Sequence, residues 1–495
     1  MTTNMPLWQQ LWRLAQRQTV PFHTPGHQQG QGILPDLAQA WGTELFRHDL
    51  PELPGLDNLL DPEGVIADAQ SLAAETFHAD RTWFLVNGST VGIMAALLAI
   101  VPPVASAPTK LLLPRTVHRS AITGLVLSGL HPVFLTPAYD PHWDLPAPLD
   151  PQRVAEGLAQ HPDCLGVFLV SPTYEGLCAD LETIAHLCHQ ANVPLIVDEA
   201  HGAHFGFHPD LPPRALDCGA DIAIQSSHKT LGALSQGAML HLRGSRIDPQ
   251  RIQGALNLLH TTSPSYLLLA TLDAARYQMA SQGEMLWDKV LTLADRCRHA
   301  LSEQTHIPYW QPETTPLPWR YYDRSRLTIA TAQWGLTGFA VDEYLDQQGI
   351  LAELVQQSRL TFLFGLGHRV TDSDRLVSAL AQVPLGHGGG APLTGVNLAN
   401  LPPIVMPSYS PREAYFAPQD CLPLAETIGR ISADLVCPYP PGIPLFLPGE
   451  RITAAAVAHL ETLEQAGATV IGLPDAQGQC LRVLREKELA ARAEG

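Results

Sequence analysis

Seven short apolar runs constrain the fold of this chain more than any other feature, because they alternate with helical patterns between about residues 65 and 285. The runs lie at 82–86, 110–113, 132–135, 166–170, 194–197, 222–224 and 238–242. Near-continuous valine, isoleucine and leucine runs are typical of strands buried on both faces of a parallel sheet. We therefore predict a mostly parallel α/β sheet, in which ligands bind at the carboxyl ends of the strands.

The length of 495 residues predicts more than one domain, since a single compact core rarely grows that large. We predict an N-terminal arm at 1–20, a major domain at 21–285, a smaller α/β domain at 286–400 and a C-terminal α+β domain at 401–495. Leucines at roughly helical spacing in the arm indicate a helix that packs against a neighbour. The proline- and glycine-rich stretch at 383–403 is typical of a linker.

Charge and cysteine content exclude several classes of protein. A formal net charge of −18 argues against a general nucleic-acid or anionic-membrane binder, which would need a basic face. None of the eight cysteines forms a CxxC pair, so we expect reduced thiols rather than a zinc ribbon or a redox motif. Residues 1–18 lack the apolar core of a signal peptide, and the run at 94–101 is too short to cross a bilayer. We expect a soluble cytoplasmic protein.

Lys229 and Asp198 follow two of the apolar runs and indicate a particular chemistry. A lysine at the end of a buried strand is costly unless its charge is neutralised, and a Schiff base with an aldehyde cofactor does this. Asp198 then suits the acid partner of a pyridine nitrogen. Together the two residues indicate pyridoxal 5′-phosphate (PLP). The alternative for Lys229, a surface lysine, is disfavoured by its position after a buried strand.

The segment Asn87-Gly88-Ser89-Thr90 follows a strand and precedes an apolar helix. The N–H groups at the start of a helix can bind a phosphate. Ser89 and Thr90 are also ordinary helix caps, and this segment alone supports both interpretations equally. Its position upstream of Asp198 and Lys229 favours the phosphate.

Several histidines lie near these residues. His118 follows the run at 110–113 and could cover a planar cofactor, although from its segment alone a structural loop histidine is favoured. His201, His204 and His208 match no standard ligand spacing, so we predict no metal site.

Short motifs extend in order from about residue 20 to residue 455. They are Thr24-Pro25-Gly26-His27, Glu52-Leu53-Pro54-Gly55-Leu56-Asp57, Asp61-Pro62-Glu63-Gly64, Val86-Asn87-Gly88-Ser89-Thr90, Ser171-Pro172-Thr173-Tyr174, Val197-Asp198-Glu199-Ala200-His201-Gly202-Ala203-His204-Phe205, Ser226-Ser227-His228-Lys229-Thr230, Thr261-Thr262-Ser263-Pro264-Ser265-Tyr266 and Pro438-Tyr439-Pro440-Pro441-Gly442-Ile443-Pro444. In this order they resemble the Orn/Lys/Arg decarboxylases, which are PLP enzymes with an aspartate-aminotransferase-type fold.

The resemblance implies a role for each matching residue. Lys229 would form the imine with PLP, Asp198 would pair with the ring nitrogen, His118 would stack on the ring and His201 would lie beside it. The residues implied to hold the phosphate are Ser89, Thr90, Ser226 and His228.

The resemblance also implies a homodimer or a higher homo-oligomer with its active site completed at the interface. Thr261, Thr262 and Ser263 would then reach the cofactor of the neighbouring subunit. Only about twenty residues precede the Thr-Pro-Gly-His motif, so the chain is similar to the short, biosynthetic-type form without the N-terminal wing domain.

The implied reaction is decarboxylation of a basic L-amino acid to its amine and CO2. Arginine giving agmatine is favoured, which would place the protein in polyamine biosynthesis, and lysine or ornithine is the alternative. Glu450 is the candidate for the distal cation of the substrate, with a solvated surface glutamate equally compatible. Two other functions are disfavoured. An aminotransferase could use Arg412 to clamp the substrate carboxylate, but the motifs above exclude it. A non-catalytic regulatory protein of the same fold would not need the intact Lys229, Asp198 and His118.

Overall fold

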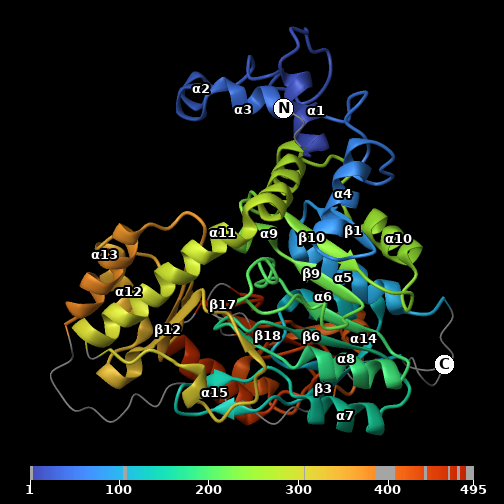
Figure 1. Ribbon diagram of the computed structural model, residues 1–495. Coiled ribbons are helices and arrows are strands. Elements are labelled where there is room, and N and C mark those ends of the chain that lie inside the picture. Colours follow the sequence, from blue (N-terminus) through green and yellow to red (C-terminus); the bar gives the residue numbers. More distant parts are fainter. Residues whose placement is uncertain are drawn as a thin grey trace. The chain divides into compact units, whose positions relative to one another are not determined.

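The computed structural model of the chain describes residues 4–103, 109–305, 307–384, 407–439, 443–465, 469–475 and 480–485 (Figure 1). The predicted linker lies almost wholly outside the described residues, as do residues 440–442 of the proline-rich motif. Among the residues described, no helix is both long and apolar enough to cross a membrane.

The central sheet has seven strands in the order β1-β10-β9-β8-β6-β2-β3. The strands are β1 (Arg81–Leu85), β2 (Lys110–Pro114), β3 (His131–Leu135), β6 (Cys164–Val170), β8 (Leu195–Asp198), β9 (Ile222–Gln225) and β10 (Ala238–Leu242). β2 pairs in parallel with β3 and β6, whereas β10 is antiparallel to both β1 and β9. Each predicted run coincides with a strand, and the mostly parallel α/β sheet is confirmed.

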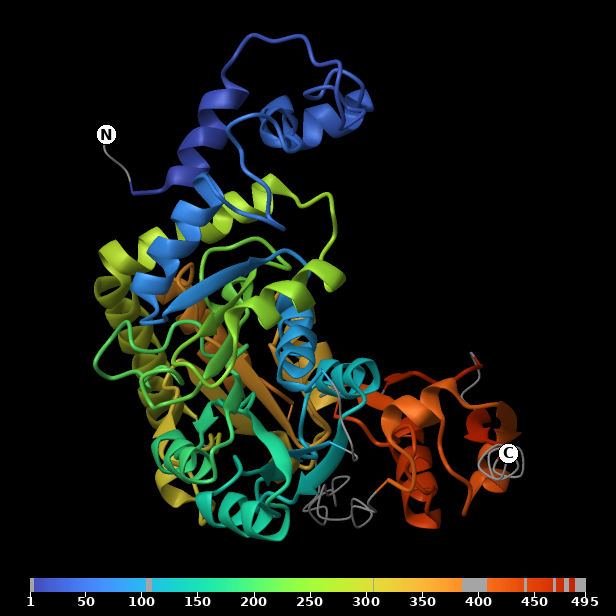
Figure 2. The ribbon, with the colours of Figure 1, turned by 90° about the vertical axis from the view of Figure 1, so that its right-hand side faces the viewer.

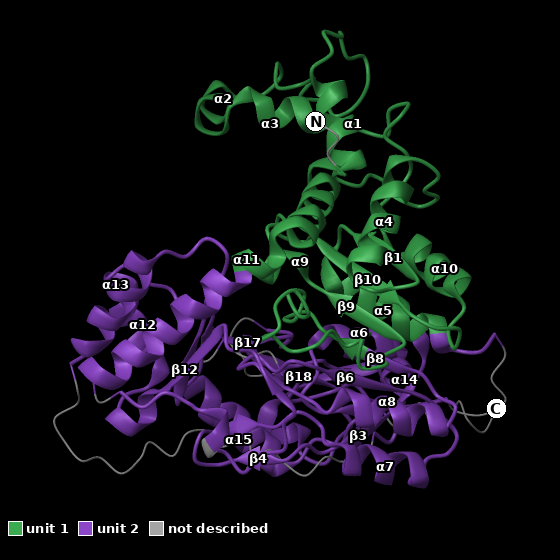
Figure 3. Cartoon of the chain, viewed as in Figure 1, with its two compact units in different colours: residues 1–99, 197–286 green, residues 100–196, 287–495 purple. Residues whose placement is uncertain are grey.

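The chain forms two compact units, coloured green and purple in Figure 3. The first consists of residues 1–99 and 197–286, and the second of residues 100–196 and 287–495. The predicted domain boundaries at 20, 285 and 400 stay predictions.

The first unit contains β1, β10 and β9, which can be followed in Figures 1 and 2. Its helices are α1 (Pro6–Ala15), α2 (Pro35–Trp41), α3 (Thr43–His48), α4 (Val65–Thr76), α5 (Gly88–Ile100), α9 (Ser227–Thr230), α10 (Pro249–Leu259) and the first part of α11 (Tyr266–Gln304). In the predicted arm, Leu7, Leu11 and Leu14 are buried while Trp12 is exposed, and α1 contacts α4. The expected amphipathic helix is therefore present.

Asp57 holds the start of α4. Its carboxylate accepts hydrogen bonds from the backbone N–H groups of Asn58, Glu63, Gly64, Ile66 and Ala67, at 2.7–3.2 Å. The residue has φ 71°, a left-handed conformation that aspartate tolerates better than most residues. Partial burial raises the pKa of Asp57, but these hydrogen bonds outweigh it and hold the pKa below its ordinary value.

Replacing Asp57 by alanine is expected to lower the free energy of unfolding by about 1–2 kcal/mol, the usual cost of a lost helix cap. Because the folded pKa is depressed, the stabilisation is present above the unfolded pKa and is lost as the pH falls through the folded value. Urea unfolding at pH 7 and at pH 3 measures both effects. Asp61→Ala, an exposed change in the same loop, is the control; equal losses in the two variants would contradict the capping role.

The second unit contains β2, β3 and β6 with α6 (Arg119–Ser128), α7 (Pro151–Gln160) and α8 (Leu181–Gln190). It also contains a three-stranded antiparallel sheet in the order β12-β14-β13. The elements of this smaller region are β12 (Arg326–Ala330), β13 (Leu354–Val355), β14 (Arg359–Leu363), α12 (Gly338–Gln347) and α13 (Val370–Ala381). Further two-residue strands of this unit, besides β13, are β4 (Tyr139–Asp140), β5 (Leu145–Pro146), β7 (Leu177–Cys178) and β11 (Tyr321–Tyr322).

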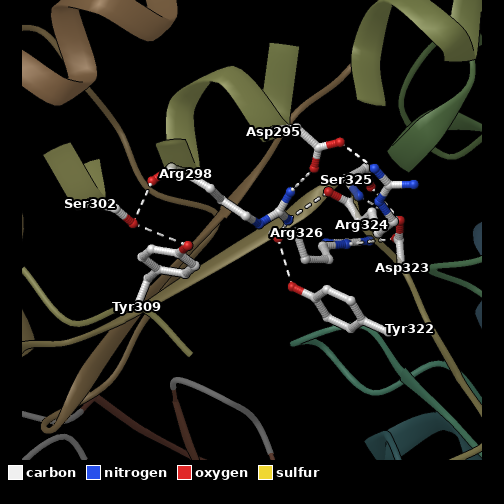
Figure 4. Close-up of polar contacts among 9 residues, drawn as sticks. All are labelled: Asp295, Arg298, Ser302, Tyr309, Tyr322, Asp323, Arg324, Ser325 and Arg326. Atoms are coloured by element: carbon white, nitrogen blue, oxygen red, sulfur yellow. Dashed lines mark hydrogen bonds and ion pairs between the residues drawn. The ribbon is translucent and has the colours of Figure 1, made fainter. Parts of the chain in front are cut away.

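Helix α11 is joined to this smaller sheet by the polar cluster shown in Figure 4. Arg298 of α11 donates to Asp295, at 2.9 Å, and to the backbone carbonyl oxygens of Arg324 (2.6 Å) and Arg326. Tyr322 donates to the carbonyl of Arg326 as well, at 2.8 Å. One guanidinium thus satisfies carbonyl groups at the start of β12 and ties them to the helix.

The C-terminal residues form small antiparallel strand pairs with helices, as the predicted α+β domain requires. β15 (Gln419–Pro423) pairs with β18 (Cys480–Leu484), and β16 (Cys437–Tyr439) pairs with β17 (Thr469–Ile471). The helices are α14 (Pro411–Phe416) and α15 (Ala454–Gln465). A local core surrounds Val436, Leu460 and Val483.

Candidate active site

Asp198 and Lys229 belong to the first unit and lie at or shortly after the carboxyl ends of the neighbouring strands β8 and β9. Asp198 is the last residue of β8 and is buried, and Lys229 belongs to the short helix α9 that follows β9. The Nζ of Lys229 lies 2.9 Å from Nε2 of His201. Burial raises the pKa of Asp198 to about 6, although the charge of Lys229 and the N–H of Ala200 both lower it. Three of the predicted residues are therefore brought together.

The predicted phosphate residues Ser89 and Ser226 also meet. Their hydroxyl oxygens are 2.9 Å apart, with Ser226 following β9 and Ser89 in the first turn of α5. Gly88 begins this helix with φ 75°, and a Cβ added to it would meet no atom within 4 Å. Open space, two hydroxyl groups and the N–H groups of a helix start suit a phosphate. The residues therefore fit PLP, because an amine and a buried acid lie close in the sequence to the two serines predicted to bind its phosphate.

Four other residues that the sequence predicted to bind the cofactor also belong to the first unit: His228, Thr90, Thr262 and Ser263. Nδ1 of His228 is 3.0 Å from the carbonyl oxygen of Gly237. Thr90 is exposed on α5. Thr262 and Ser263 are exposed in the loop before α11, where the N–H of Ser263 donates to the Thr261 hydroxyl at 3.2 Å. Their roles toward a cofactor stay predictions.

His118 lies in the second unit, where it is the N-cap of α6. Its Nδ1 accepts from the N–H of Ser120 at 3.3 Å and lies 2.7 Å from the Ser120 hydroxyl. The imidazole thus caps a helix, which is a structural role and agrees with the interpretation as a structural loop histidine. Stacking on a cofactor ring stays a prediction for this residue.

Glu450 forms a buried ion pair with Arg115, also within the second unit. The carboxylate accepts both guanidinium N–H groups, at 2.6 and 2.9 Å, and Arg115 also donates to the carbonyl of Leu445 at 2.8 Å. Burial raises the pKa of Glu450, against the lowering effect of Arg115. Arg115 was not among the residues predicted from the sequence, although it lies three residues before His118. The carboxylate of Glu450 therefore already has a partner, Arg115. Its predicted role in binding the substrate stays a prediction.

Replacing Arg115 by methionine is expected to lower the free energy of unfolding by about 3–5 kcal/mol, because the buried Glu450 loses its partner. The double variant Arg115→Met/Glu450→Met, which leaves no unpaired buried charge, is expected to recover most of this loss. Urea unfolding measures both. The control is Arg153→Met, which breaks an exposed ion pair with Glu156 and is expected to cost at most about 1 kcal/mol. Equal costs for the two single variants would contradict the argument.

The profile of the Orn/Lys/Arg decarboxylase major domain matches residues 5–372, and that of the C-terminal domain matches residues 399–482. The chain belongs to the Orn/Lys/Arg decarboxylase family. The predicted family is thereby confirmed, and with it the prediction of an amino-acid decarboxylase.

Among the relatives of the chain are proteins named arginine decarboxylase and proteins named lysine decarboxylase. The arginine decarboxylase of Bacillus subtilis is 38% identical over 98% of this chain and 98% of its own length. The lysine decarboxylase LdcA of Pseudomonas aeruginosa is 27% identical over 90% of this chain and 73% of its own length.

Two solved structures have the same fold. The lysine decarboxylase LdcF of Francisella novicida aligns with a TM-score of 0.83 at 23% identity, over 97% of this chain and 81% of that one. The constitutive lysine decarboxylase of Escherichia coli aligns with a TM-score of 0.82 at 22% identity, over 97% and 82%. The predicted fold class is confirmed.

Proposed function

We propose that this chain is a PLP-dependent decarboxylase of a basic L-amino acid, with arginine favoured and agmatine and CO2 as products. The observation that carries the proposal is the Lys229 amine at 2.9 Å from His201, in the electrostatic range of the buried Asp198. For the substrate, three relatives named arginine decarboxylase are 35–38% identical over at least 97% of the chain, whereas those named lysine decarboxylase are 24–27% identical. Lysine is the alternative.

The residues of the site would divide the work as follows. When bound, PLP supplies an electron sink for the electron pair that departing CO2 leaves behind. Lys229 would hold the cofactor covalently, and Asp198 would keep its ring nitrogen protonated, because an opposite charge at contact favours the charged form. His201, at hydrogen-bond distance from Nζ of Lys229, can exchange a proton with that amine.

The phosphate would lie at the start of α5, where Ser89 and Ser226 present their hydroxyl groups. Thr90 and His228 would complete this phosphate site, and His118 would cover the ring. In a homodimer, Thr262 and Ser263 of one subunit would reach the cofactor of the other. We place this enzyme in the cytoplasm.

Glu450 is proposed to bind the distal cation of the substrate. A guanidinium binds a carboxylate through two parallel hydrogen bonds, whereas the ammonium of lysine acts as a point charge. Arg115 now makes such a two-bond contact with Glu450, so the carboxylate has the geometry for a guanidinium. Binding of arginine there requires exchange of one guanidinium for another.

A substrate panel tests the reaction. With PLP added, the protein is expected to release CO2 from arginine faster than from lysine or ornithine. Reduction with borohydride followed by peptide mapping is expected to find the pyridoxyl group on Lys229. Turnover that requires a keto acid and releases no CO2 would favour the aminotransferase, and absence of any pyridoxyl peptide would favour a non-catalytic protein.

A further inference from the structure

A row of buried polar side chains crosses three strands of the first unit and ends at the residue that follows β8. Glu199, directly after β8, is followed by Gln225 of β9, His241 of β10 and Thr82 of β1. β1, β10 and β9 lie side by side in the green unit of Figure 3, with His241 opposite Thr82. All four side chains are at most 2% exposed, so each polar atom depends on a partner within the protein.

Hydrogen bonds join the row from end to end. Oε1 of Glu199 accepts from the N–H of Ala215 at 2.8 Å, and Oε2 accepts from Nε2 of Gln225 at 2.7 Å. Oε1 of Gln225 lies 3.1 Å from Nε2 of His241, whose Nδ1 lies 2.8 Å from the Thr82 hydroxyl. Burial, together with the charge of Arg214, lowers the pKa of His241 to about 3, so this imidazole is neutral and has one donor and one acceptor.

The row has only two consistent arrangements of donors. With Glu199 ionised, Gln225 donates to it, the Gln225 oxygen accepts from Nε2–H of His241, and Nδ1 accepts from Thr82. With a proton on Glu199, the carboxyl group donates and every later bond reverses, because an amide and a neutral imidazole each have one donating and one accepting side. Burial raises the pKa of Glu199 to about 8, against the lowering effect of Gln225 and Ala215.

The row is attached to the proposed cofactor residues through the backbone. Glu199 directly follows Asp198, and Gln225 directly precedes Ser226. Successive residues of an extended chain point to opposite faces, so a bond between Glu199 and Gln225 on one face fixes the spacing of Asp198 and Ser226 on the other. The N–H of Glu199 also donates to the carbonyl of Ile224, at 2.9 Å.

We propose that Glu199 is a positioning residue: its carboxylate, when ionised, sets the direction of this hydrogen-bond row and thereby holds Asp198 and Ser226 in place for PLP. The inference rests on the proposed function. Its physical basis is the charge-assisted bond to Gln225, which is roughly twice as strong as a bond between neutral groups. Neither Glu199 nor the row touches the reacting atoms.

Two variants are expected to differ in which side chains donate the hydrogen bonds from position 225 to Thr82. In Glu199→Gln the new amide accepts from Ala215 and must donate to Gln225, so every later bond reverses. In the double variant Glu199→Gln/Gln225→Glu, the amide donates to the new carboxylate, which accepts again from Nε2–H of His241. The double variant thus restores the direction of the bonds from position 225 to Thr82 and keeps one negative charge. Glu284→Gln, an exposed change on α11, is the matched control.

The experiment compares the PLP affinity of these proteins by absorbance titration at pH 9, above the pKa of Glu199, so that the wild type is ionised. Glu199→Gln is expected to weaken PLP binding about tenfold or more, and the double variant to return to within about threefold of the wild type. Glu284→Gln is expected to change nothing. Wild-type affinity in Glu199→Gln, or no recovery in the double variant, would overturn the proposal.

The melting temperature of the cofactor-free proteins gives a second readout that does not depend on PLP. At pH 9 it is expected to rise in Glu199→Gln, because the amide removes a charge whose burial raises the pKa of Glu199, and to return toward the wild-type value in the double variant, which again buries one carboxylate; no return in the double variant would count against the row. Should Glu199→Gln fail to fold, Thr82→Val tests the far end, because it removes one donor hydroxyl at nearly constant shape; unchanged PLP affinity in that variant would also overturn the proposal. If the wild type binds no PLP at all, the proposed function fails, whereas the melting temperatures still decide whether the row exists.

Discussion

In the Lys229→Ala variant, release of CO2 from arginine is expected to fall by at least about a thousandfold, because no other group can replace a covalent catalyst. Two contacts suit Lys229 for this role: its amine is at hydrogen-bond distance from His201, and it interacts electrostatically with the buried Asp198. The variant is also expected to lose the absorbance band of the bound cofactor. A radiometric or manometric CO2 assay, combined with the absorption spectrum, measures both effects.

Lys289→Ala supplies the control for this experiment, since Lys289 is exposed on α11 and its loss is expected to leave turnover unchanged. If Lys229→Ala retains more than about a tenth of wild-type turnover, the amine is not the covalent catalyst. Chemical trapping would then identify the lysine that is.

The Asp198→Asn variant is expected to lose at least about a hundredfold in turnover, since the amide keeps the shape of the side chain but removes the charge that holds the ring nitrogen protonated. Asp288→Asn, an exposed change on α11, is the control. Turnover of Asp198→Asn near the wild-type rate would show that the pyridine nitrogen has no anionic partner at this position.

The same substitution is expected to stabilise the cofactor-free protein at neutral pH. Burial raises the pKa of Asp198 to about 6, so between its unfolded pKa and this value the folded state holds a proton that the unfolded state has lost. Stability therefore falls as the pH rises through that window, by about 2–3 kcal/mol for this group. Urea unfolding of the cofactor-free wild type and of Asp198→Asn between pH 5 and pH 8 measures the difference, which is expected to grow with pH. A constant difference would contradict the argument.

Much of the central sheet could be predicted because its signal is local. The runs at 222–224 and 238–242 contain almost only apolar residues, and they form β9 and β10. That β10 runs antiparallel to both of its neighbours could not be predicted, because strand direction depends on which distant segments pair.

The candidate site was predictable where chemistry marks single residues and not where it depends on distant pairs. Lys229 and Asp198 stand out because charged groups are rare at the ends of buried strands. Arg115 and Glu450 are 335 positions apart, so no local pattern connects them. Glu199 lies inside a recognised motif, yet its partners Gln225 and Ala215 come from other segments and were visible only in the structure.

The discontinuous first unit has a consequence for how the protein is made. Strand β1 is synthesised early, but its pairing partner β10 follows only after about 150 further residues, which takes roughly 10–30 seconds at usual rates of translation. During that time an apolar strand edge is present without its partner, and such edges attract other chains. We expect residues 81–85 to be the segment of the nascent polypeptide that most needs shielding by a chaperone.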